Sequence, residues 1–244
     1  MKAYNYDGSF DGMLCCVYRA FTEKEHPFAV YSDDFQPSFD TQIIEVKTDP
    51  EIAARVAAGI RKNCSISLLS TFSYVMRSGD GLKGTVVFNA IKKCLEARKD
   101  ITSNYADYDM LAFADLKERI SFEIHRFKGF MRFEECEGGG LYAHFSPDND
   151  IVDLLAPHFK SRYPGERFII HDIKRNKMSL YDGKEIHNLS LSTPITMFLS
   201  SEEKNFQSLW KTYFKSVNIK ERKNLKLQDH FLPRRYRKNM SEFL

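Results

Sequence analysis

A change of hydrophobic period near residue 128 constrains the fold of this 244-residue chain more than any other feature. Apolar residues recur every three or four positions from Phe113 to Phe127, which predicts a helix over 109–127. Three consecutive glycines at 138–140 then separate two short apolar stretches, a pattern typical of a β-hairpin. The sequence therefore predicts that helices pack with an antiparallel sheet, which is the α+β class.

Elements on both sides of this change follow from their start signals and periods. Ser9 is expected to cap one helix, and Asp49 followed by Pro50 to begin another. Before the change, we expect strands at 2–6, 28–31 and 42–47, and helices at 9–21, 50–62, 65–77 and 82–99. After it, we expect a helix at 148–163, strands at 167–173, 178–181 and 186–189, and a helix at 201–216.

These elements predict an antiparallel sheet of hairpins flanked by helices, with a helical N-terminal subdomain. A polar break at 100–104 suggests a division into two parts. The first would be an N-terminal α/β subdomain (1–104). The second would be an α+β subdomain with a basic C-terminal segment (105–244). One continuous domain is the alternative.

The positive charge is concentrated near the C-terminus. Residues 210–238 carry ten Lys or Arg and two acidic residues, a net charge of +8, whereas the whole chain has +3. A polyanion such as DNA is therefore the first partner to consider. Polar and aromatic residues lie among the cations, which favours nucleic acid over the alternative of a solvated basic helix end. The candidate DNA-binding residues in this segment are Arg222, Asn224, Lys226, Arg234, Arg235 and Tyr236.

A first histidine-bearing segment lies at the end of the long predicted helix. His125 is followed by cations beside a glycine and three phenylalanines, and such a mixture suits a phosphate and base surface. Rings that pack into the core, at a helix-to-strand junction, are the alternative. The candidate DNA-binding residues here are Arg126, Lys128 and Arg132.

A second such segment contains His171 and Asp172, followed by Lys174 and Arg175. Neighbours on a strand point to opposite faces, so His171 and Asp172 do not form a dyad by adjacency alone. His171, Lys174 and Arg175 are candidates for the same DNA-binding surface. A half-buried hairpin strand with basic turn residues is the alternative.

Sequence signatures for metals and nucleotides are missing. The seven histidines and five cysteines lack metal-ligand spacings, so we expect no metal and no cofactor. The run Gly79–Gly84 matches Gly-x-Gly-x-x-Gly, but it follows a predicted helix, and we interpret it as an interhelical loop. With no long apolar run and no signal-peptide pattern, we expect a cytoplasmic protein without a membrane segment, whose thiols are reduced and mostly buried.

A set of motifs resembles one bacterial family of DNA metabolism or DNA repair proteins, built on a domain of unknown function. The motifs are Tyr6–Leu14, Glu123–Phe133, Ile170–Arg175, Leu209–Phe214, Ile219–Asn224 and Leu232–Tyr236. The resemblance covers nearly the whole chain and implies a radical-SAM DNA modification or repair protein as partner. Some relatives carry a fused uracil-DNA-glycosylase-like domain, so the resemblance alone does not imply glycosylase activity for this chain. Relatives also have Tyr-Trp where this chain has Tyr236-Arg237, so a ring-based role at 237 does not carry over.

Three functions are compatible with these patterns. The first is a DNA-binding accessory protein whose basic end folds back towards the two histidine-bearing segments, forming one continuous phosphate-binding surface. The second is a DNA-processing enzyme of the nuclease or base-excision type, with His125 as general acid or base and Glu123 or Asp172 as the orienting carboxylate. The third is an interaction protein whose basic segment docks on an acidic partner.

Overall fold

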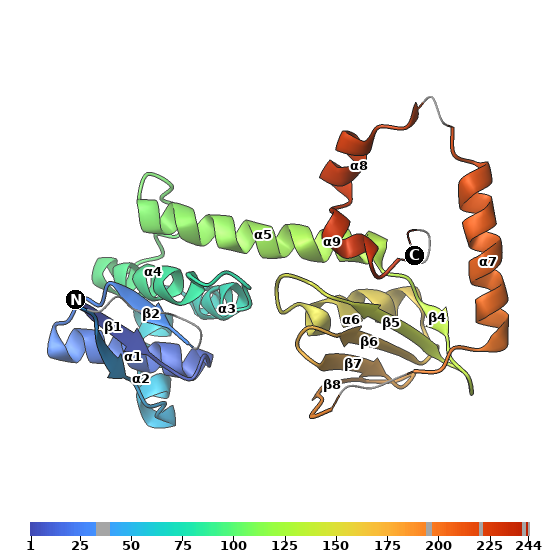
Figure 1. Cartoon of the computed structure of the whole chain (residues 1–244). Helices are drawn as coiled ribbons and strands as arrows, with labels where there is room; N and C mark the ends of the chain where they lie inside the picture. Colours follow the sequence, from blue (N-terminus) through green and yellow to red (C-terminus); the bar gives the residue numbers. More distant parts are fainter. Residues whose placement is uncertain (33–39, 194–196, 220–221, 241–242, 244) are drawn as a thin grey trace. The chain divides into compact units, whose positions relative to one another are not determined.

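The computed structural model describes residues 1–32, 40–193, 197–219, 222–240 and 243. The chain forms two compact units, Met1–Ser121 and Phe122–Leu244 (Figure 1). Helices and strands occur in both, which confirms the α+β class. The two units divide inside one long helix, α5 (Tyr108–Phe130), which is later in the chain than the polar break at 100–104.

The first unit contains a three-stranded parallel sheet with four helices before α5. The strands are β1 (Lys2–Asn5), β2 (Ala29–Tyr31) and β3 (Gln42–Glu45), in the order β2-β1-β3. The helices are α1 (Phe10–Glu23), α2 (Pro50–Asn63), α3 (Ile66–Val75) and α4 (Lys83–Ala97). Both predicted helix starts are confirmed, since Ser9 accepts a hydrogen bond from the Gly12 amide and Asp49 from the Glu51 amide.

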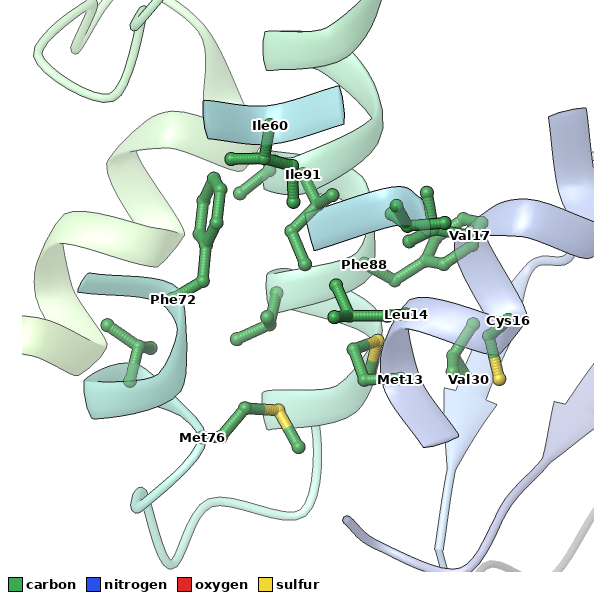
Figure 2. Packing of buried hydrophobic residues seen from close by; sticks show 14 of the residues in the cluster. Met13, Leu14, Cys16, Val17, Val30, Ile60, Phe72, Met76, Phe88 and Ile91 are labelled. Atoms are coloured by element: carbon green, nitrogen blue, oxygen red, sulfur yellow. The ribbon is translucent and has the colours of Figure 1, made fainter. Parts of the chain in front are cut away.

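A single apolar cluster holds the first unit together. Side chains from α1, α2, α3 and α4 meet beside the sheet, with Met13, Leu14, Phe72, Phe88 and Ile91 among the most buried (Figure 2). Because such burial removes apolar surface from water, this cluster is the main stabilising term of the unit.

Gly79 and Gly81 lie between α3 and α4, which confirms the prediction of an interhelical loop, and Gly84 lies in the first turn of α4. At Gly84, the start of α4 packs closely against β2. A Cβ atom placed there would lie 2.3 Å from the carbonyl oxygen of Val30, so only glycine fits at this close approach.

The second unit contains a five-stranded sheet in the order β4-β5-β6-β7-β8. The strands are β4 (Glu134–Glu135), β5 (Leu141–Phe145), β6 (Phe168–Asp172), β7 (Lys177–Tyr181) and β8 (Ile186–Ser190). Three of the four strand pairs are antiparallel, whereas β5 and β6 run parallel. The reason is that α6 (Val152–Arg162) connects them as a crossover, and a helical crossover returns the chain in the same direction.

One face of this sheet is covered by α6. Phe159 of α6 contacts Phe133 with ring centroids 5.0 Å apart, and Phe133 contacts Phe168 of β6 at 5.7 Å. Phe127 of α5 packs on Phe145 of β5 at 4.8 Å. Some of the phenylalanines near the first histidine-bearing segment are therefore core residues, as the alternative interpretation held.

The described residues from 197 onward form what we call the C-terminal arm. Its helices are α7 (Ser201–Ser216), α8 (Leu225–Phe231) and α9 (Arg234–Arg237) (Figure 1). The predicted helix at 201–216 is confirmed. No residue of α7 or α8 is buried, whereas α9 buries Tyr236. The arm is therefore attached to the unit mainly through its two ends.

Two features bear on the chain's surroundings. Within the described ranges, none of the helices combines the length and the apolar character needed to cross a membrane. All five cysteines are free thiols and four are buried, as expected from the sequence.

Candidate nucleic-acid interface

Glu123 is a buried carboxylate of the second unit. It lies on α5 with 3 % of its surface exposed. Its Oε1 accepts hydrogen bonds from the Asp148 amide (2.7 Å) and the Tyr236 hydroxyl (2.7 Å). Its Oε2 accepts from the Asn149 amide (2.8 Å) and the Asn149 side-chain nitrogen (2.6 Å). Four donors therefore stabilise the buried charge, as such a charge requires.

The loop that Glu123 binds is held from a second side by Asp172 and Arg175. Asp172 is fully buried at the end of β6 and accepts a 2.9 Å hydrogen bond from Arg175 Nη1. The same guanidinium donates to the carbonyl oxygens of Pro147 (3.1 Å) and Asp148. Segments that are separate in the sequence thus converge on residues 147–149.

The end of the arm reaches the same loop through α9. Arg235 Nε donates to Asp148 Oδ2 at 2.8 Å, and its guanidinium lies 4.8 Å above the Tyr236 ring. The Tyr236 ring packs on Phe127 at 4.8 Å. Burial, reinforced by the hydrogen bond to Glu123, raises the pKa of Tyr236, so its hydroxyl remains a donor at neutral pH. Arg235 and Tyr236 of the basic end thus contact α5 and the loop at 147–149 through acidic groups of the same unit.

Three arginines of the basic segment 210–238 are paired with acidic groups of the same unit. Arg235 pairs with Asp148, and Arg234 and Arg237 both pair with Asp229, with N–O distances of 2.9 and 2.6 Å for the last two. Arg237 also donates to the Leu232 carbonyl. These arginines hold the arm in place, and part of their charge is neutralised within the chain.

The other described cations of the basic segment 210–238 make no ion pair with any described residue. They are Lys211, Lys215, Arg222, Lys223, Lys226 and Lys238. Lys220, counted with them in the sequence, lies outside the described residues. Most of these side chains are exposed, so this is where the net positive charge of the arm faces solvent.

A groove of about 790 Å³ opens between the end of α7 and α8. Aromatic and aliphatic side chains form its walls, and Arg222, Lys223 and Arg237 contribute cations. Asn224 and Gln228 add amide groups, and no acidic residue lines the groove among the residues described. The full lining is Phe214, Val217, Asn218, Ile219, Arg222, Lys223, Asn224, Leu225, Leu227, Gln228, Phe231, Arg237 and Phe243.

A family model supplies the first comparison with known proteins. The model of the family described as a domain of unknown function, DUF4130, matches residues 82–242, which is more than half of the chain. The chain belongs to the DUF4130 family. No curated protein and no solved structure matches it.

The DUF4130 match covers nearly all of the candidate interface. Glu123, Asp172, Arg175, Tyr236 and the lining of the groove up to Arg237 fall inside residues 82–242, whereas Phe243 lies one position beyond them. Residues 1–81, including the Tyr6–Leu14 motif of the resemblance, lie outside it. The residues that converge on 147–149 thus lie within the part of the chain that matches DUF4130.

Within the described parts of the DUF4130 region, the proposed catalytic residue His125 does not contact Glu123 or Asp172. His125 is exposed on α5 and forms no hydrogen bond or ion pair within the described parts of the chain. Glu123 lies two positions earlier, on a different side of the helix, where its oxygens are occupied by other donors. Asp172 is likewise occupied by Arg175 and by the amides of residues 174 and 175.

The remaining predicted DNA-binding residues differ in how exposed they are. Arg126 and Lys128 are half-exposed, whereas Arg132 donates to the Gly129 carbonyl at the end of α5. Lys174 is exposed in the turn after β6.

His171 is buried and lies 2.8 Å from the Tyr142 hydroxyl through Nδ1, so it belongs to the sheet and not to an exposed basic surface. Burial lowers its pKa.

Sequence reasoning missed the groove and the role of residues 147–149. Residues 146–149 read Ser-Pro-Asp-Asn, which indicates only a turn or a helix start. The rings of the groove resemble any half-buried helix face in the sequence. Only the path of the arm brings these residues together.

Proposed function

We propose that this DUF4130 protein is a DNA-binding accessory protein of a bacterial DNA repair or modification system. The observation that supports this most is the charge of the C-terminal arm, where the groove carries three cations and no carboxylate among its described lining residues. Exposed, unpaired cations on α7, α8 and the segment between them extend this surface.

The physical basis is the release of counterions from DNA. Each Lys or Arg that neutralises a phosphate frees condensed cations, and this gives affinity that falls with salt. Lys211 and Lys215 are four residues apart and therefore lie on one side of α7. Arg222, Lys223 and Lys226 continue the charge towards α8. These five cations are candidate contacts for the phosphates of a nucleic-acid backbone.

The identity of the partner rests on the resemblance alone. The family that the motifs resemble implies a radical-SAM protein, and we include it in the proposal as the enzyme to which the bound DNA is presented. The enzymatic alternative has no observation in its favour, because His125 has neither carboxylate as an orienting partner in the described residues.

The test is DNA binding measured against salt by fluorescence anisotropy on the full chain. Changing Arg222→Gln together with Lys223→Gln removes two candidate phosphate contacts. We expect the slope of log affinity against log salt to become shallower by about 1.4 for a single strand or about 1.8 for a duplex. The matched control is Arg61→Gln with Lys62→Gln, an exposed Arg-Lys pair at the end of α2, which should leave the slope unchanged.

Two outcomes would contradict the proposal. One is the absence of DNA binding at about 50 mM salt, where electrostatic contacts are strong. The other is an equal slope for the groove pair and the control pair. Any DNA processing that is lost in His125→Ala with binding retained would instead support the enzyme hypothesis.

A further inference from the structure

The groove between α7 and α8 has the shape and lining of a site for an unpaired strand. We infer that it binds single-stranded nucleic acid, with bases stacked on its rings and phosphates held by Arg222 and Lys223. This inference rests on the proposed function and narrows it, because a general basic surface binds duplex and single strands alike.

The walls of the groove are too apolar for a duplex. Phe214, Val217 and Leu227 line it together with the exposed ring of Phe231. A duplex presents phosphates to its surroundings and keeps its base faces stacked inside. An unpaired strand can turn its bases outward, and each base has a flat face that stacks on an aromatic ring. The apolar lining therefore gains contacts only from a single strand.

One wall of the groove is fixed in place. Phe243 contacts Phe214 with ring centroids 6.0 Å apart, and the Arg237 guanidinium lies 5.2 Å from the Phe243 ring. Arg237 is itself held by Asp229, so the ring and the guanidinium form a prepared surface. A surface that is already ordered loses less entropy when a ligand binds.

The polar groups of the groove suit a ligand that has both anionic phosphates and bases with hydrogen-bonding edges. Arg222 and Lys223 make no ion pair with described residues. The Asn224 side-chain oxygen caps α8 by accepting from the Leu227 amide at 3.0 Å, which leaves its amide nitrogen as a donor. The Gln228 side chain makes no hydrogen bond within the described residues. Phosphates satisfy the cations, and base edges satisfy the amides.

The charge of the groove argues for this occupant over a neutral apolar peptide. Arg237 is paired with Asp229, but Arg222 and Lys223 have no ion pair with described residues, so the groove repels cationic ligands and leaves a neutral ligand beside two unpaired charges. An acidic amphipathic peptide would share the charge of a nucleic acid but would offer no planar bases to the rings. The experiment therefore includes such a peptide as a competitor.

The experiment measures the affinity of the full chain for a labelled oligothymidylate and for a labelled hairpin duplex. Phe231→Ala should weaken oligothymidylate binding about tenfold, the value typical of one lost stacking contact, and leave duplex binding nearly unchanged. Phe231→Trp should retain the affinity because it keeps a stacking ring. The matched control is Phe206→Ala, since Phe206 is as exposed as Phe231 (64 %) but lies outside the groove.

Several results would overturn the inference. Equal affinity for the two DNA forms, or equal effects of Phe231→Ala and Phe206→Ala, would leave a DNA-binding protein without the single-strand site. Tight binding of an acidic amphipathic peptide, with no competition by oligothymidylate, would assign the groove to an acidic protein partner. Loss of all DNA binding by the unmodified chain would overturn the proposed function as well.

Discussion

Tyr236 donates a 2.7 Å hydrogen bond to the buried carboxylate of Glu123, a residue that precedes it by 113 positions. The bond connects the last helix of the arm to α5, and both residues also contact the loop at 147–149 through Asp148. The stability of the arm and that of the loop are therefore expected to change together.

Removing the Tyr236 hydroxyl tests this connection. Tyr236→Phe keeps the packing on Phe127 but takes one of four donors from Glu123. We expect a loss of about 1–3 kcal/mol in the free energy of unfolding, since a buried group loses a partner. Urea unfolding followed by the fluorescence of Trp210, the single tryptophan, reports on the arm directly. Tyr213→Phe, an exposed phenol on α7, should have no effect, and equal losses in the two variants would contradict the expectation.

Replacing the Glu123 carboxylate should lower the free energy of unfolding by more than removing the Tyr236 hydroxyl does. Glu123→Gln removes the charge and presents an amide NH₂ to groups that are themselves donors. Hydrogen bonds to a charged group contribute about 1.5–3 kcal/mol each, so we expect a larger loss than in Tyr236→Phe. Chemical denaturation and limited proteolysis of the arm measure it. A result no larger than that of Glu118→Gln, an exposed position on α5, would refute a stabilising role.

The two sheet histidines predict how stability depends on pH. Burial lowers the pKa of His171, against a smaller opposing effect of Asp172, and burial together with His171 lowers that of His144. The unfolded chain therefore binds protons near pH 6.5 that the folded chain does not. Stability should be fully present above about pH 6.5 and decrease as the pH falls through the lower folded values.

A substitution of His171 separates the histidine contribution to pH-dependent stability from the contributions of other titratable groups. Glu134 has a raised pKa, mainly from burial, and acts in the opposite direction at lower pH. Replacing His171→Gln should therefore flatten the fall in stability between neutral and mildly acidic pH. The exposed His125→Gln should leave the profile unchanged, and a steep fall retained in His171→Gln would show that another group is responsible.

Two glycine-to-alanine substitutions in the first unit are expected to change its stability in opposite directions. Gly84→Ala places a Cβ atom 2.3 Å from the Val30 carbonyl and should destabilise by about 1–3 kcal/mol, as overpacking does. Gly59→Ala, in α2, meets nothing within 4 Å and should stabilise by up to about 1 kcal/mol through helix propensity. Thermal unfolding of the two variants checks both signs, and destabilisation by both would contradict this account of Gly84.

Local elements were predictable because their signals lie within a few residues of the element. Ser9 and Asp49 cap helices through amides two or three positions away, so the sequence alone contains the interaction. The glycines at 138–140 adopt positive φ angles and form the expected turn between β4 and β5. The change of period near residue 128 likewise marks the end of α5.

Contacts between distant segments were not predictable in the same way. Glu123 has the sequence context of a surface acid on a helix, and its burial depends on Asn149 and Tyr236. The parallel pairing of β5 and β6 depends on the helix between them acting as a crossover. The intramolecular partner of Arg235 is Asp148, 87 positions away, which no spacing rule could identify.

The arm is fastened at both of its ends to the same unit. At its start, Glu203 accepts from the Glu135 amide and Gln207 donates to Glu134, and at its finish Tyr236 binds Glu123. A segment closed in this way samples far fewer conformations than a free tail of equal length. Proteolytic cleavage anywhere along it would restore that freedom, so a nicked chain would retain every residue of the groove and yet be expected to bind the proposed single strand more weakly.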